Sequence, residues 1–155
     1  INHFLYLMDK YKVKYLIVGG RASIYYGVLR LTGDIDIFYE ISNENIKNLY
    51  AALREFWGGE VLGVENEKEL SKKDQIIQYG IPPNRIDLMG NITGVEFKDC
   101  WERKITDKIK IGKRIINIYY IGIDDLIKNK EKMSRDKDKE DLKYLYEKRK
   151  IINNR

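Results

Sequence analysis

The chain has 155 residues, of which 43% are hydrophobic and 34% charged, a composition that predicts one compact domain over residues 1–155 with a net charge of +5. A single cysteine, Cys100, and a single histidine, His3, exclude an internal disulfide framework, a Cys/His zinc site and a Ser-His-Asp hydrolase. The lone cysteine suits a reducing, cytoplasmic compartment, and no apolar run approaches the roughly 20 residues that span a bilayer, so we expect no membrane partner.

Hydrophobic spacing in the first part of the chain favours alternating helices and strands. It predicts helices over 2–11, 22–31 and 43–57, and strands over 14–18 and 34–39. Gly19 and Gly20 predict a tight turn directly after the first strand, and Gly58 with Gly59 predicts the end of the third helix.

The second part of the chain favours further strands and two closing helices. Residues 60–72 are polar and carry no clear pattern. The following segments predict strands over 76–79, 85–89, 106–111 and 114–120, a brief helical turn within 94–101, and helices over 124–132 and 136–150. This order indicates an α/β (α+β) fold in which helices pack against a mixed β-sheet.

The basic residues gather near the C-terminus. Residues 128–150 carry ten Lys or Arg and six Asp or Glu. Such a segment suits a polyanion such as RNA or a triphosphate. The alternative is a solvated helix face with i,i+4 ion pairs.

Three aspartates suggest a metal-binding cluster. Side chains alternate along a strand, so Asp34 and Asp36 project from one face, about 7 Å apart, while Ile35 and Ile37 point into a core. Asp87 lies in a second apolar strand, and it completes the cluster if the two strands are neighbours. Oxygen ligands of this kind suit Mg²⁺, and two ions would serve an in-line phosphoryl displacement.

Each signal also has an ordinary explanation. An Asp-x-Asp pair is common at surface turns, Gly-Gly often marks only a tight turn, and Asp87 has a potential ion-pair partner in Arg85. The case for a site rests on the conjunction of these signals in this order.

The conjunction resembles the minimal nucleotidyltransferase superfamily, whose signature is a hydrophobic residue, Gly-Gly or Gly-Ser, a gap and Asp-x-Asp. It is most similar to the branch of AbiE-type toxin nucleotidyltransferases and their single-domain relatives. Three blocks carry the resemblance: Gly19-Gly20-Arg21-Ala22 with Gly27, Arg30 and Thr32; Asp87-Leu88 with Gly94 and Phe97; and Ile123 to Ile127 with Lys130, Arg135, Lys137, Asp138, Asp141 and Leu142.

The resemblance implies roles for individual residues. Asp34, Asp36 and Asp87 would bind Mg²⁺ and catalyse transfer, with Asp87 helping to deprotonate the acceptor. The nucleotide contacts would come from Gly19, Gly20, Ser23, Arg30, Thr32 and Lys130. Ser23 is equally well explained as a solvent-facing helix residue, and Lys130 as one more solvated lysine. We expect Arg135, Asp138 and Asp141 to form an ion-pair network that fixes the last helix.

The function predicted from this resemblance is transfer of a nucleoside monophosphate from an NTP to a hydroxyl of RNA such as tRNA, of a protein or of a small molecule, in a toxin–antitoxin or phage-defence setting. Larger toxin members carry an additional helical bundle, so we expect a partner protein or a homodimer to help hold the acceptor. One alternative is a non-catalytic, nucleotide-binding module of antitoxin-like or regulatory type. Another is a small RNA-binding protein with incidental carboxylates, which would show salt-sensitive affinity that ignores Mg²⁺ and NTP.

Overall fold

The computed structural model describes all 155 residues. Its helices are α1 (Asn2–Lys10), α2 (Gly19–Tyr25), α3 (Asn43–Trp57), α4 (Phe97–Glu102), α5 (Ile123–Met133), α6 (Asp136–Asn153) and the 3₁₀ helix η1 (Glu67–Ser71). Its strands are β1 (Tyr15–Val18), β2 (Ile35–Tyr39), β3 (Ile76–Tyr79), β4 (Ile86–Met89), β5 (Ile105–Ile111) and β6 (Arg114–Tyr120). None of the helices combines the length and the apolar character that a membrane crossing requires.

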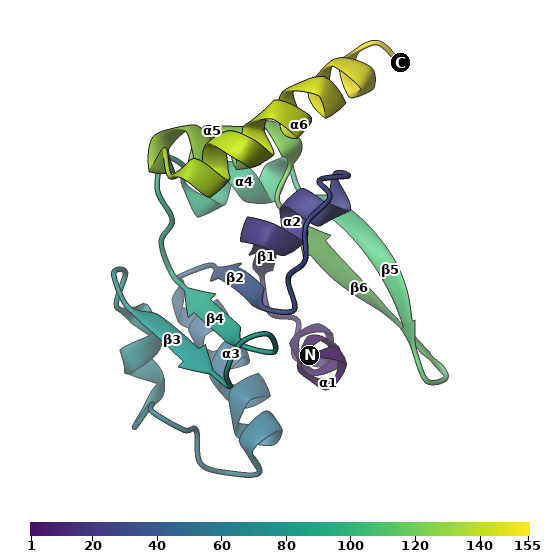
Figure 1. Ribbon diagram of the computed structural model, residues 1–155. Coiled ribbons are helices and arrows are strands. Elements are labelled where there is room, and N and C mark those ends of the chain that lie inside the picture. The colour runs from purple at the N-terminus through teal and green to yellow at the C-terminus, as the bar shows by residue number, and fades with distance from the viewer.

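The six strands form one mixed sheet in the order β3-β4-β2-β1-β6-β5. β2 and β4 run parallel, as do β1 and β6, whereas the remaining neighbours are antiparallel. Helices cover both faces, with α1 and α3 on one side and α4, α5 and α6 on the other (Figure 1). This arrangement confirms the expected α+β fold.

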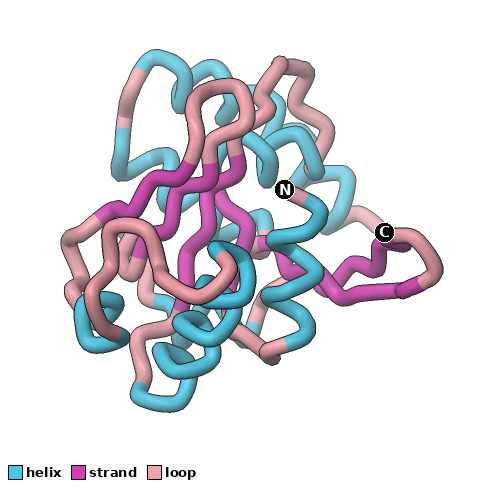
Figure 2. The backbone as a smooth tube through the Cα atoms, turned by 90° about the horizontal axis from the view of Figure 1, so that it is seen from below, coloured by secondary structure: helices cyan, strands magenta, loops and turns pink.

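The central strand β1 is buried on both faces because alternate side chains enter two different cores. Tyr15 and Ile17 pack with α1 and α3, while Leu16 and Val18 pack with the helices of the opposite face. A strand buried on both faces shows a continuous apolar run instead of alternation. The apolar run of β1 therefore lies at the centre of the fold. Figure 2 shows the strands with helices around them.

The long helix α3 is fixed at both ends by local interactions. The Ser42 side chain accepts a hydrogen bond from the Asn45 backbone at 3.2 Å, and Gly58 ends the helix with a left-handed conformation at φ 75°. The buried Asn45 carboxamide also bonds the backbone of Lys14 and Glu40. These bonds attach the start of α3 to the residue that precedes β1 and the residue that follows β2.

Most expected elements agree with the structure to within a few residues, but the helix predicted over 22–31 is wrong. α2 begins at Gly19 and ends at Tyr25, and residues 28–34 form an extended loop. Gly27 has φ 101° and breaks the helix. The apolar spacing was misleading because Leu31 is 99% exposed and Ile24 is only partly covered. The unassigned segment 60–72 contains η1.

Candidate active site

Two aspartates face each other across neighbouring parallel strands. Asp36 on β2 and Asp87 on β4 are register partners. Ile35 and Ile37, which flank Asp36, are fully buried on the opposite face of the sheet. The alternation predicted from the sequence therefore places Asp36 on the face away from that core, and pairing of the strands brings Asp87 to it.

The Asp36 carboxyl lies where negative charge is poorly compensated. Burial raises the pKa of Asp36 to about 6, and the charge and hydrogen bonding of Asp87 add to the rise. The positive charges of Lys137 and Arg85 act in the opposite direction on the same pKa. A carboxylate pair in this state, with Asp87 buried and Asp36 partly buried, favours binding a proton or a cation.

Arg85 connects two of the three candidate acids, Asp34 and Asp87. Its guanidinium pairs with both oxygens of Asp87, with Nε–Oδ1 at 2.7 Å and Nη2–Oδ2 at 3.0 Å. Its backbone N–H donates to Oδ1 of Asp34 at 2.9 Å, and its carbonyl accepts from the N–H of Ile35. The alternative considered for Asp87, pairing with Arg85, is thus present in the structure.

The three aspartates do not converge as a closed metal cage. No group of three or more Asp, Glu, His and Cys side chains is arranged to hold a metal ion. Asp36 and Asp87 approach each other, whereas Asp34 precedes β2 and uses one carboxylate oxygen for the Arg85 backbone. All three nevertheless line the same cavity.

This cavity has a volume of about 450 Å³ and combines acidic and basic walls. Eight of the nine expected site residues line it: Gly19, Gly20, Arg30, Thr32, Asp34, Asp36, Asp87 and Lys130. Further lining comes from the cations Arg85, Arg135 and Lys137. A carboxylate floor beside five cationic side chains suits a metal-bound polyphosphate.

Gly19 is required by close packing against Asp36. It has φ 66°, and a Cβ at this position would lie 2.1 Å from Oδ2 of Asp36. A Cβ on Gly20 would lie 3.2 Å from Thr32 Cγ2. The two glycines, which are the first residues of α2, therefore let the start of this helix approach Asp36 and the loop that contains Thr32.

A buried ion network lies beside the cavity. Lys130 Nζ contacts Oδ2 of Asp141 at 3.0 Å and Oδ1 of Asp138 at 3.4 Å. Arg30 pairs with Asp141 at 2.8 Å, and Arg135 pairs with Asp138 at 2.7 Å. The predicted network of Arg135, Asp138 and Asp141 is confirmed, with Lys130 as its centre.

Two residues expected to contact the nucleotide, Ser23 and Lys130, are instead bonded to the buried aspartates of this network. Ser23 is completely buried, does not line the cavity, and places its hydroxyl 3.3 Å from Oδ2 of Asp141. Neither the solvent-facing alternative for Ser23 nor that for Lys130 fits, since Lys130 is only 3% exposed. Both residues join α2 and α5 to α6.

The sequence reasoning assigned no role to Lys137. Its side chain is exposed, lines the cavity and makes no ion pair, yet its charge acts on Asp36. The available signal was its position within the Arg-x-Lys-Asp motif, between two residues of the buried network. Lys137 is the cation here that no carboxylate partner holds.

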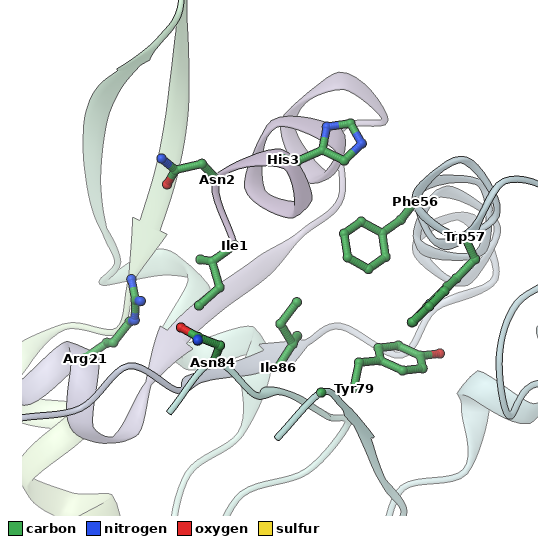
Figure 3. A pocket seen from close by; sticks show the side chains of 10 residues that line it. Ile1, Asn2, His3, Arg21, Phe56, Trp57, Tyr79, Asn84 and Ile86 are labelled. Carbon is green, nitrogen blue, oxygen red and sulfur yellow. The ribbon is translucent and has the colours of Figure 1, made fainter. Parts of the chain in front are cut away.

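A second hollow of about 610 Å³ lies between the start of α1, the end of α3 and the β3–β4 turn (Figure 3). Its walls include Phe56, Trp57, Tyr79 and Ile86, with Arg21 at one end. It contains no carboxylate. Since Arg21 donates to the carbonyls of residues 33 and 34, this hollow lies behind the Asp34 loop and outside the acidic site.

Comparison with known families agrees with this geometry. Residues 2–148 match the family model described as a nucleotidyltransferase of unknown function (DUF6036). The match covers nearly the whole chain, so the chain belongs to this family. No curated protein matches the sequence.

Proposed function

We propose that this member of the nucleotidyltransferase family transfers a nucleoside monophosphate from an NTP to a hydroxyl group, with Mg²⁺ as cofactor. The observation that carries the proposal is the pairing of Asp36 with Asp87 beneath a cation-lined cavity, against the backbone of Gly19. The acceptor oxygen forms a bond to the α-phosphorus, and the bond between that phosphorus and the bridging oxygen breaks. Pyrophosphate leaves, and the hydroxyl proton goes to a carboxylate.

The carboxylate pair fits a hard divalent cation. Its ligands are oxygens, and burial together with the charge of Asp87 raises the pKa of Asp36 despite the opposing charges of Lys137 and Arg85. Asp36 and Asp87 would hold the ion, with Asp34 as the third ligand at the rim. Bound magnesium would neutralise charge on the reacting phosphate and align the two oxygens of an in-line displacement.

The remaining residues have distinct tasks. Asp87 accepts the acceptor proton. Lys137 and Arg30 supply positive charge to the triphosphate and then to the departing pyrophosphate, while Gly19 and Gly20 leave room for its approach. Lys130 is a positioning residue. It pairs with the buried Asp138 and Asp141, and these two aspartates in turn hold Arg135 and Arg30 at the cavity wall.

The test is label transfer from each of four α-labelled NTPs, with Mg²⁺, to fractionated cellular RNA, protein and small molecules. The parent is compared with Asp36→Asn and with Asp99→Asn, a matched change at an exposed acid on α4. We expect label in one fraction with the parent and the Asp99 variant, and none with Asp36→Asn. Persistence of transfer in a folded Asp36→Asn protein contradicts the proposal.

Magnesium-dependent NTP binding without transfer to any fraction would instead indicate the nucleotide-binding module of antitoxin-like or regulatory type. Restoration of transfer by a partner protein would retain the enzyme assignment. The resemblance to toxin nucleotidyltransferases supports a toxin–antitoxin or phage-defence setting as part of the proposal.

A further inference from the structure

One hairpin is strongly basic. Residues 104–114 contain five Lys or Arg and a single acid, Asp107, and this net charge of +4 equals that of the longer segment 128–150. No member of this segment takes part in an ion pair. In contrast, five of the ten basic residues in 128–150 are paired with carboxylates: Lys130, Arg135, Lys143, Arg149 and Lys150.

The β5–β6 hairpin extends from the body at the edge of the sheet (Figures 1 and 2). One face is occupied, because Ile109 and Ile111 pack against the core that contains α1. Arg114 on the hairpin contacts the ring of Tyr6 on α1. The other face is exposed at Lys108, Lys110 and Ile115 and is covered only near the body, where Trp101 of α4 packs on Tyr119.

The uncovered face carries the free lysines. Lys108 is the register partner of Asn117, and Lys110 is the partner of Ile115, so the four side chains share this face. Both lysines are exposed, as is Lys113 at the turn. These three are the ammonium groups on the hairpin with no aromatic or carboxylate contact.

The lysine face continues onto the body of the protein. Tyr119 alternates onto the same face as Asn117. The Nζ of Lys104 lies 6.0 Å from the Tyr119 ring centroid and 4.1 Å from that of Trp101. A row of cations next to partly exposed aromatic rings is a typical footprint for a nucleic-acid strand.

The geometry points to the β5–β6 hairpin as a docking arm for RNA, the acceptor of the transfer reaction. The assignment of RNA rests on the proposed function, because each RNA nucleotide presents a 2′-hydroxyl in addition to the phosphate charge. Lys108, Lys110 and Lys113 contact the phosphates. The arm binds the strand through charge and positions it without reading its sequence.

The arm is tested by the affinity of the protein for a fluorescent single-stranded RNA, measured by anisotropy over a salt series in the absence of NTP and metal. The variant Lys108→Ala/Lys110→Ala/Lys113→Ala is compared with Lys47→Ala/Lys68→Ala/Lys72→Ala, a control that removes the same charge at exposed, unpaired lysines elsewhere. Because each phosphate contact in a single strand contributes about 0.7 to the slope of log K against log salt, the arm variant should lose about 2 from that slope. The control should keep the parent slope and most of the parent affinity.

The outcomes separate this inference from the proposed chemistry. An arm variant that binds RNA as the parent does overturns the inference, as does a control that loses as much affinity. Arm-dependent binding to anionic phospholipid vesicles, without arm-dependent binding to RNA, also overturns it. Since the assay contains no NTP, failure of nucleotidyl transfer leaves this binding result unaffected. Circular dichroism of both variants verifies folding.

Discussion

Asp36 lies directly opposite Asp87 on the neighbouring parallel strand, and both side chains line the cavity that contains Lys137. The pair is unfavourable by itself, because burial and the charge of Asp87 together raise the pKa of Asp36. A site that stores repulsion between carboxylates gains stability when a cation enters. The closeness of Asp36 and Asp87 should therefore be detectable in the free energy of unfolding, both through its pH dependence and through its response to a bound cation.

The first prediction concerns Asp36→Asn in metal-free buffer. The pKa of Asp36 rises from 3.8 to about 6 on folding, so the folded state holds this proton more tightly than the unfolded chain. Protonation of Asp36 therefore stabilises the folded state. This contribution to the free energy of unfolding is complete below pH 4 and is lost as the pH rises through 6. At pH 8 the charged form costs at most about 3 kcal/mol, which Asp36→Asn should largely recover.

This gain is measured by urea unfolding in EDTA at pH 5 and pH 8. The increase in the free energy of unfolding should be larger at pH 8, and Asp99→Asn should show no such difference. A variant that is less stable than the parent at pH 8 would mean that the Asp36 carboxylate is well compensated in the folded protein.

The second prediction concerns metal and nucleotide. Mg²⁺ with a non-hydrolysable NTP analogue should raise the thermal midpoint of the parent, because the ligand binds the folded state alone. At a ligand concentration of 100 Kd the gain is about 2.7 kcal/mol. Asp87→Asn should abolish the magnesium-dependent part, and chelation with EDTA should reverse it in the parent. Equal shifts in parent and variant would exclude Asp87 as a metal ligand.

The sequence placed each member of the carboxylate pair on a strand but left their pairing conditional. Strand alternation placed Asp36 away from Ile35, and the apolar context of Asp87 indicated a second strand, which the structure pairs with the first. The burial of Lys130 was not predictable, because it depends on Asp138 and Asp141 reaching it from α6. Pairing between separate helices leaves no local pattern in a charged segment. The absence of a partner for Lys137 likewise becomes visible only in three dimensions.

The third prediction separates these two lysines. Lys130→Met leaves Asp138 and Asp141 buried without their shared cation, so it should destabilise the fold by about 3–5 kcal/mol. Lys137→Met breaks no ion pair and should change stability by less than about 0.5 kcal/mol. It should nevertheless weaken NTP binding and reduce transfer, because the unpaired charge faces the cavity.

Urea unfolding and NTP titration of both variants test this contrast, with Lys139→Met as the control on the exposed surface of α6. Normal NTP affinity in Lys137→Met would remove this residue from the nucleotide site. Wild-type stability in Lys130→Met would show that the two aspartates are satisfied by Arg30 and Arg135 alone.

The last prediction concerns Gly19→Ala, with Gly58→Ala as its matched control. Both glycines have positive φ values, 66° and 75°, so both alanines carry a left-handed backbone cost of about 1–2 kcal/mol. Only at Gly19 does the new Cβ also meet Oδ2 of Asp36, at 2.1 Å, whereas nothing lies within 4 Å at Gly58. Gly19→Ala should therefore be less stable than Gly58→Ala by about 1–3 kcal/mol from overpacking. It should also lose nucleotidyl transfer, since Asp36 is displaced from Asp87, while Gly58→Ala keeps the parent rate. Equal activity of the two variants under conditions where both are folded would show that the close approach of Gly19 to Asp36 is not needed for the reaction.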